Sequence, residues 1–158
     1  MNPKFRVKDL MDRTKVNLDF IYEHRNRESG PYEVTQLINS FLGAFVHVKE
    51  GFFEHVPADH APYKNWPVIK TDPGYPDPKN LRELVRLIRN SLAHGNIDFI
   101  PNDNDDIAAV HIWNNDRNCA KIWGTEITVD DLRKLLEQFI RLMTPILKQH
   151  EPKVEHQP

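Results

Sequence analysis

Hydrophobic positions recur at helical spacing in four stretches of the chain. The stretches are residues 7–25, 33–49, 79–94 and 128–149. In each, an apolar residue returns every three or four positions, which is the pattern of an amphipathic α-helix. Asn80 at the start of the third stretch and Gly95 after its end are residues that favour helix caps. Pro145 falls inside the last stretch and is expected to kink or break that helix.

Between the third and fourth predicted helices the pattern changes to short runs rich in Ile, Val, Phe and Trp. These runs are residues 97–100, 108–113 and 120–125. Clusters of Asn and Asp separate them and favour turns, so we predict short β-strands. Trp113 and Trp123 are expected to cover the core as cross-strand partners. The pattern predicts a mainly α fold: a four-helix up-down bundle with a small β-hairpin or β-sheet insert between the third and fourth helices.

The length of 158 residues indicates a single domain. We expect this domain to cover residues 1–150 and the polar segment 151–158 to form a frayed tail. Six of the 12 prolines lie within residues 57–78. Because proline donates no amide and restricts the residue before it, this stretch is predicted to be a surface crossover loop. Whether the loop also covers a functional site is left open at this point.

Overall charge excludes one class of function. With 21 Lys and Arg against 23 Asp and Glu, the net charge of −2 excludes coating of nucleic acid or anionic membrane by bulk attraction. The single cysteine, Cys119, excludes an intrachain disulfide. Neither a signal peptide nor a membrane-spanning apolar run is evident, so a cytoplasmic protein is expected. His47, His55 and His60 fit no compact metal motif, and no metal or cofactor is expected.

The third predicted helix concentrates basic charge that the chain as a whole lacks. Its cations are Lys79, Arg82, Arg86 and Arg89, against the single acid Glu83. Arg82 begins a series of polar residues at every fourth position that ends at His94, so these residues share one flank. Guanidinium binds phosphate in bidentate fashion and imidazole moves protons, so the strip suits a phosphodiester. The alternative is a solvated face whose cations pair with acids on neighbouring helices.

The run Arg89-Asn90-Ser91-Leu92-Ala93-His94 resembles the Arg-polar-x-x-x-His motif of the HEPN superfamily. Its place late in a helix, with a β insert before the last helix, is similar to HEPN nucleases of bacterial chromosomes and plasmids. The resemblance implies a HEPN-like bundle and a metal-independent endoribonuclease, a toxin or phage-defence effector. Arg89 would bind the scissile phosphate and His94 would transfer protons. Asn90 would orient either the phosphate or the histidine. Lys79, Arg82 and Arg86 are the candidates for binding RNA. Attack by the 2′-hydroxyl would give a 2′,3′-cyclic phosphate and a 5′-hydroxyl.

The resemblance also implies a homodimer with a composite active site. Arg89 and His94 lie about 140° apart on an ideal helix, so two antiparallel helices could bring His94 of one chain near Arg89 of the other. A toxin or defence role implies an antitoxin or defence partner, but Asn96 replaces the tyrosine that many toxins with nucleotidyltransferase antitoxins carry. Two alternatives stay open. One is an inactive HEPN-like module that binds RNA or protein; the other is a structural bundle in which Arg89 and His94 form a buried polar network.

Overall fold

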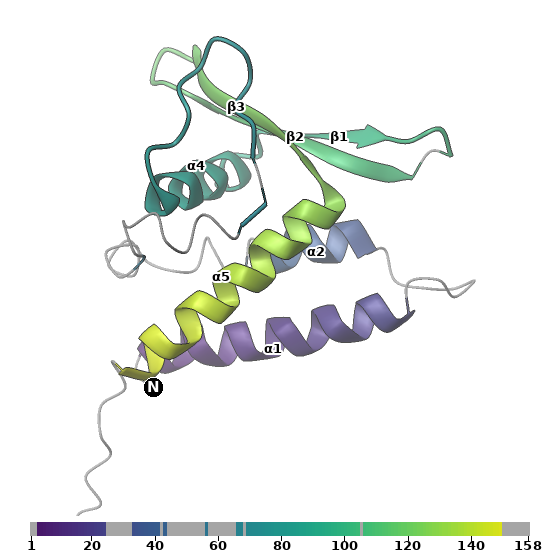
Figure 1. Cartoon of the computed structure of the whole chain (residues 1–158), viewed down its shortest axis with the longest axis vertical. Coiled ribbons are helices and arrows are strands. Elements are labelled where there is room, and N and C mark those ends of the chain that lie inside the picture. Colours follow the sequence, from purple (N-terminus) through teal and green to yellow (C-terminus); the bar gives the residue numbers. More distant parts are fainter. Residues whose placement is uncertain are drawn as a thin grey trace, which may run out of the picture.

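A computed structural model shows how these segments are arranged (Figure 1). It describes residues 3–24, 33–41, 43, 56, 66–67, 69–104 and 106–149. The elements in order are α1 (Pro3–His24), α2 (Glu33–Phe41), α4 (Leu81–Ala93), β1 (Ile97–Pro101), β2 (Ile107–Asn115), β3 (Lys121–Thr128) and α5 (Val129–Gln149). The four predicted helices and three predicted strands are confirmed, with shifted ends. Apart from Gly43, the rest of the second predicted helix, up to Lys49, lies outside the described residues.

The three strands form one antiparallel sheet in the order β1-β2-β3. Val110 on the central strand lies opposite Phe99 on β1 and Ile127 on β3. Since residues opposite each other share a face, alternate positions build one apolar face of the sheet. Its buried side chains include Val110, Ile112, Trp123 and Ile127. We call this the inner face; helix α4 packs against β2, and α5 contacts β2 and β3.

The tryptophans do not form the predicted cross-strand pair. Trp123 lies opposite Asn114, and Trp113 lies opposite Gly124. Trp123 is buried on the inner face, at 2% exposure, whereas Trp113 is half-buried on the opposite, outer face. The side-chain period of a strand is two, so a one-residue difference in register moves a side chain to the other face of the sheet.

The prediction of a mainly α four-helix up-down bundle is wrong. Helices α1, α2 and α5 contact one another, but α4 lies apart from them against the sheet (Figure 1). The strands are longer than predicted: β2 has 9 residues and β3 has 8. Their apolar inner face is large enough to take the apolar side of α4, because a sheet hydrophobic on one face must bury it against another element. The described fold therefore combines helices with a three-stranded sheet that belongs to the core.

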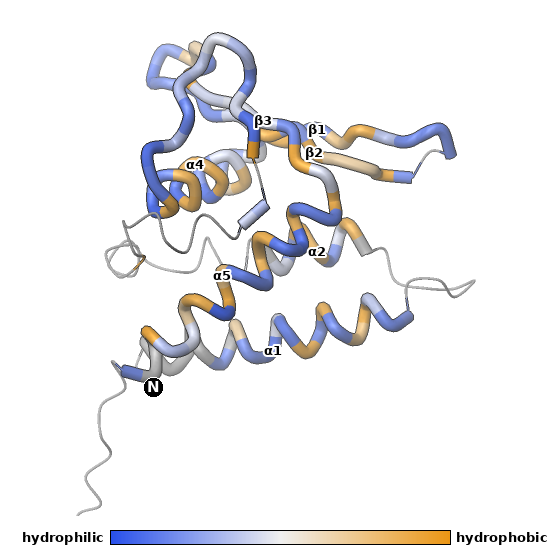
Figure 2. Tube along the Cα trace, viewed as in Figure 1, coloured by the Kyte–Doolittle hydropathy of each residue, from blue (hydrophilic) through white to orange (hydrophobic). Residues whose placement is uncertain are grey.

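Helix α5 connects the sheet to the helical part of the molecule. It begins where β3 ends, and the Thr128 hydroxyl caps it by accepting from the Asp131 amide at 3.1 Å. Its core positions are Leu132, Leu135, Leu136, Phe139, Ile140 and Met143, none more than 4% exposed. In Figure 2 hydrophobic and hydrophilic residues alternate along α5. The helix continues through Pro145 to Gln149, so the predicted local break is absent. Among the described helices, none combines the length and apolar character needed to cross a membrane.

Candidate functional site

Helix α4 is capped at both ends, which positions the motif that it carries. The Asn80 side chain accepts from the Glu83 amide at 2.9 Å, as the sequence predicts for the first turn. At the other end Gly95 adopts a φ of 69°, where a side chain would be strained. The Asn96 amide then donates to the Ser91 carbonyl at 2.9 Å, the six-to-one bond of a Schellman motif. This turn makes His94 the C-cap of the helix, directly after its last residue, and directs the chain into β1.

The three predicted catalytic residues differ in exposure. Arg89 and Asn90 are half-buried, and the Nε atom of Arg89 is shielded from solvent. Ala93 and His94 are exposed. A half-buried arginine and an exposed histidine five positions later lie on different sides of the helix, as its periodicity requires. The structure places all three on the last two turns of α4; their roles stay predictions.

The predicted RNA-binding cations do not form one free strip. Arg82 donates from Nε and Nη2 to the carbonyl of Val56, at 2.9 and 2.7 Å. Val56 is fully buried, so the fork of Arg82 holds a distant segment of the chain against α4. Arg86 and Lys79 are exposed. Within the described residues, these two are the better placed of the three cations to meet a polyanion.

Buried polar groups fasten the middle of α4 to the sheet. The Leu87 carbonyl accepts from the Ser91 hydroxyl at 2.9 Å and from the Asn114 side-chain amide at 2.8 Å. Ser91 is fully buried and Asn114 is 5% exposed, so both bonds form away from water. Removing one partner of such a buried bond leaves an unsatisfied group and is costly. The bond from Asn114 on β2 therefore holds the part of α4 that carries Arg89 against the sheet.

A second polar centre lies on the outer face of the sheet, and the sequence analysis missed it. The Oδ2 atom of Asp72 is 2.9 Å from Nε2 of His111 and 2.6 Å from Nζ of Lys121. The three side chains are 21%, 28% and 31% exposed, respectively. They come from the loop before α4, from β2 and from β3. We call Asp72, His111 and Lys121 the outer-face cluster.

The carboxylate of Asp72 is ionised at neutral pH. Burial would by itself raise its pKa, but hydrogen bonds from Lys121 and His111 outweigh that effect and leave the pKa below its ordinary value of 3.8. A carboxylate only accepts hydrogen bonds, so the Nε2 atom of His111 must carry the proton that points to Asp72. In neutral His111 the other ring nitrogen, Nδ1, is then the acceptor. Such a carboxylate-imidazole pair can orient a proton-transferring histidine.

Gly124 allows Asp72 to come this close to the sheet. A Cβ atom at Gly124 would collide with Oδ2 of Asp72 and would lie 2.5 Å from Cε of Lys121. The loop is also tied to β3 through its backbone. The Asp72 amide donates to the Gly124 carbonyl at 2.8 Å, and the Thr125 hydroxyl donates to the Lys70 carbonyl at 2.8 Å. The described end of the predicted proline-rich loop is thus fixed along the edge of β3; residues 57–65 and 68 lie outside the described residues.

One signal in the sequence pointed toward this cluster. A glycine inside a predicted strand often marks the close approach of another chain segment or a ligand, and Gly124 is such a glycine. Two-residue periodicity also places His111 and Trp113 on one face of β2. No pattern in the sequence indicates that Asp72, 39 residues before His111, is the segment that approaches.

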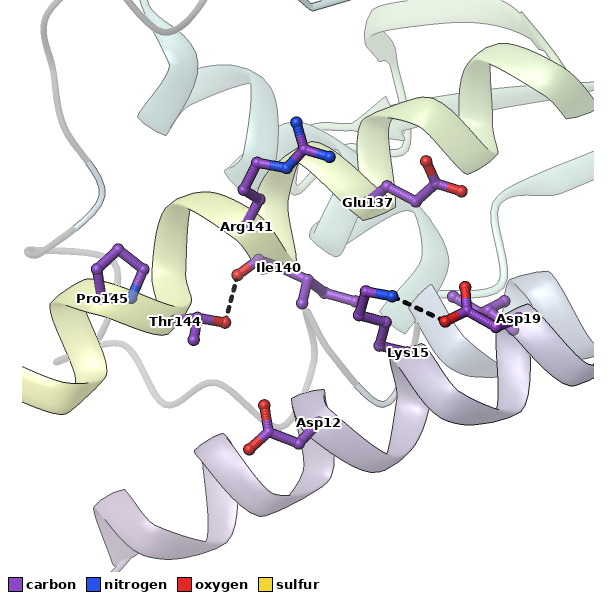
Figure 3. Close-up of a pocket in the computed structure, with 9 residues that line it drawn as sticks. Asp12, Lys15, Asp19, Glu137, Ile140, Arg141, Thr144 and Pro145 are labelled. Atoms are coloured by element: carbon purple, nitrogen blue, oxygen red, sulfur yellow. Dashed lines mark hydrogen bonds and ion pairs between the residues drawn. The ribbon is translucent and has the colours of Figure 1, made fainter.

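A hollow of about 430 Å³ lies between α1 and α5 (Figure 3). Leu18 and Ile140 contribute apolar surface to it. Its charged residues are Asp12, Lys15, Asp19, Glu137 and Arg141. Within it, Lys15 donates to Asp19 at 2.7 Å, an exposed pair one helical turn apart. Acids outnumber bases in this hollow, so it does not suit RNA phosphates.

No metal site is apparent in the part of the chain that the structure describes. There, no three His, Cys, Asp or Glu side chains are grouped so that they could hold a metal ion. Three histidines that were considered as metal ligands from the sequence lie outside the described residues: His47, His55 and His60.

Comparison with protein families identifies the family to which the chain belongs. A family model described as HEPN pEK499 p136 matches residues 1–151, nearly the whole chain. The protein therefore belongs to this family of HEPN domains, as the resemblance of the 89–94 run predicts. Comparisons with curated proteins and with solved structures give no match.

Proposed function

We propose that this protein is a metal-independent endoribonuclease whose active site is built on the last two turns of α4. Membership of a HEPN family supports an RNA-related, nuclease-like module in general terms. The observation that favours this particular site is the exposed imidazole of His94 at the end of a helix capped on both sides. A group that exchanges protons with a substrate must be reachable and held in place.

In this proposal each residue has a distinct chemical task. Arg89 donates to the scissile phosphate and stabilises the charge that builds up on it in the transition state. His94 takes the proton of the ribose 2′-hydroxyl, or gives a proton to the leaving 5′-oxygen. The oxygen-phosphorus bond that forms closes a 2′,3′-cyclic phosphate, and the bond that breaks releases a 5′-hydroxyl. Asn90, half-buried beside Arg89, orients the phosphate or the imidazole.

The site is proposed to be complete only in a homodimer. Arg89 and His94 lie on different sides of α4, so one helix does not easily bring both to the same phosphorus atom. Ala93 is small and exposed next to His94, which permits close approach of a second α4. In a twofold dimer each site would combine Arg89 of one protomer with His94 of its partner.

Cleavage is tested by incubating wild type, His94→Ala and Arg89→Ala with mixed RNA in EDTA and mapping the product ends. We expect wild type to leave cyclic phosphates and 5′-hydroxyls, and both variants to lose cleavage with unchanged thermal unfolding curves. If both folded variants cleave as fast as wild type, the site is assigned wrongly. If wild type binds RNA without cutting it, the protein is instead a HEPN-like binding module, which is the second candidate function.

Mixing the two inactive variants tests the composite site. In a heterodimer of His94→Ala and Arg89→Ala protomers, one of the two sites keeps both residues and the other loses both. Random exchange of protomers should therefore restore about a quarter of wild-type activity. No recovery after exchange, verified by sedimentation of the mixed dimer, would show that each site lies within one chain.

The proposed toxin or phage-defence role rests only on the proposed nuclease activity. Expression of wild type should stop bacterial growth, whereas expression of His94→Ala should not. Equal growth inhibition by both proteins would contradict this role.

A further inference from the structure

Two neighbouring residues of β2 hold the segment of α4 that carries the proposed catalytic residues. The side-chain amide of Asn114 donates to the Leu87 carbonyl at 2.8 Å, just before this segment. The backbone amide of Trp113 donates to the Asn96 carbonyl at 3.3 Å, just after it. The run from Arg89 to His94 therefore lies between two points that are bonded to the same strand.

Of these two bonds, the one from Asn114 is made by a side chain and lies away from water. Asn114 is 5% exposed, and Trp123, at 2% exposure, lies opposite it on β3. Residues opposite each other on one face of a sheet have Cβ atoms about 4.5–5.5 Å apart, so the indole limits the positions that the Asn114 amide can take. The Leu87 carbonyl thus meets a donor that is fixed on the sheet.

Apolar packing alone would define the position of α4 less closely than this bond does. The buried apolar residues of the helix are Leu81, Leu84, Val85, Ile88 and Leu92. Contacts between apolar surfaces are non-directional, so a small rotation of the helix on the sheet changes the buried area little. A hydrogen bond weakens steeply when its angle is distorted, and a satisfied buried polar bond specifies one arrangement.

A small rotation of α4 would matter most for Arg89. Side-chain groups lie about 5–6 Å from a helix axis, so a rotation of roughly 20° shifts them by about 2 Å. A misplacement of about 1 Å in an active site can cost roughly 10²-fold in rate. The Nε atom of Arg89 is shielded from solvent, so the side chain lies close against the protein and its direction depends on where α4 sits.

We propose that Asn114 is a positioning residue for the active site on α4. Through the Leu87 carbonyl it sets the rotation of the helix on the sheet, and thereby the direction in which Arg89 meets the scissile phosphate. At 5% exposure Asn114 is out of reach of a substrate, so it acts only through α4. The catalytic consequence rests on the proposed ribonuclease activity, whereas the effect on Arg89 itself does not depend on cleavage.

Asn114→Leu and Ser91→Ala form a matched pair of variants. Each removes one side-chain hydrogen bond to the Leu87 carbonyl, and both residues are buried. The bond from Ser91 lies within α4, whereas the bond from Asn114 joins α4 to β2, so only Asn114→Leu releases the helix from the strand. Both variants should unfold at a lower temperature than wild type, and kinetics are measured where all three proteins are folded. If Asn114→Leu does not fold, Asn114→Ala removes the donor without adding bulk and takes its place.

Cleavage kinetics separate a positioning role from a purely structural one. Asn114→Leu should lower kcat about 10–100-fold, because Arg89 no longer meets the transition state in the right direction. KM should stay within about twofold of wild type, since the exposed cations that meet RNA are unchanged. Ser91→Ala should keep kcat within about twofold of wild type. An unchanged kcat in folded Asn114→Leu, or an equal loss in Ser91→Ala, would overturn the proposal.

The NMR signal of the Arg89 Nε–H group tests the same role without any cleavage. In Asn114→Leu we expect this signal to shift and its hydrogen to exchange with water about tenfold faster or more, because the helix is no longer held in one rotation. In Ser91→Ala the signal should stay close to that of wild type. If wild type cuts no RNA but the two variants differ in this way, only the proposed ribonuclease fails. If wild type cuts RNA but Asn114→Leu changes neither kcat nor the Arg89 signal, only the positioning role of Asn114 fails.

Discussion

The end of α4 and the outer-face cluster are two polar centres built in opposite ways. Arg89 and His94 are close in the sequence, and one helix with its caps places them. Asp72, His111 and Lys121 are brought together over separations of 39 and 49 residues. The first centre presents an exposed imidazole, whereas in the second the imidazole is bonded to a carboxylate. A local motif can thus be recognised in the sequence, whereas a non-local cluster needs the fold.

The contrast is sharpest in what each histidine is expected to do. We expect His94→Ala to reduce RNA cleavage about 10²–10⁴-fold, the usual contribution of a general acid or base. We expect His111→Ala to leave the cleavage rate close to that of wild type. Rates on one RNA substrate, with both proteins shown to be folded, decide between the two centres. A large loss with His111→Ala and none with His94→Ala would move the active site to the outer face.

Two arginines on α4 separate structural from surface roles. Arg82→Ala should lower the free energy of unfolding by about 1.5–3 kcal/mol, because the buried Val56 carbonyl loses both of the hydrogen bonds that Arg82 donates. Arg86→Ala, one turn later and exposed, should change it by less than about 0.5 kcal/mol. Urea unfolding measures both. In RNA binding, Arg86→Ala should instead weaken affinity and flatten its salt dependence. Equal stability of the two variants would contradict the structural role assigned to Arg82.

Gly124 tests how closely the loop approaches the sheet. Gly124→Ala should destabilise the fold by about 1–2 kcal/mol, since the new methyl group displaces Asp72 and Lys121. The cost should be smaller in an Asp72→Ala background, where one of the displaced side chains is absent. Thermal unfolding of the two single variants and the double variant gives the coupling. Strict additivity would mean that the methyl group does not act through Asp72.

The smallest effect concerns the charge of Asp72. The pKa of Asp72 is lower in the folded state than its ordinary value of 3.8, which applies to the unfolded chain. The ionised carboxylate therefore stabilises the fold above about pH 3.8, and this contribution is lost as the pH falls below that value. Asp72→Asn should cost about 0.5–1 kcal/mol near neutral pH, and less as the solution is acidified toward about pH 3. Chemical unfolding of both proteins at several pH values measures the difference. If the stability difference between wild type and Asp72→Asn grows on acidification, folding does not lower the pKa of Asp72.

Much of the local structure was predictable from the sequence. Asn80 and Gly95 mark the ends of α4, and the structure places both in the expected caps. Apolar periodicity identified every described helix and strand, because burial of one face sets that period. The resemblance of the 89–94 run to HEPN motifs agrees with the family that the chain matches. The catalytic roles of Arg89, Asn90 and His94 stay predictions for the experiments above.

What the sequence could not show was which element each apolar face would meet. The apolar stripe of α4 is compatible with three other helices or with a sheet, since a hydrophobic face has no preference for the kind of surface that covers it. Likewise, Trp113 and Trp123 belong to similar apolar runs, and only the register of β2 against β3 puts one in the core and one on the outer face.

By itself, the sequence determined the helices, the strands, the caps of α4 and the motif from Arg89 to His94. These depend on residues a few positions apart, whose spacing and backbone preferences act locally. Only the tertiary structure decided that α4 packs on a sheet and that Asp72 meets His111 and Lys121 above Gly124. Such contacts depend on burial and register between distant segments, which no local pattern of residues specifies.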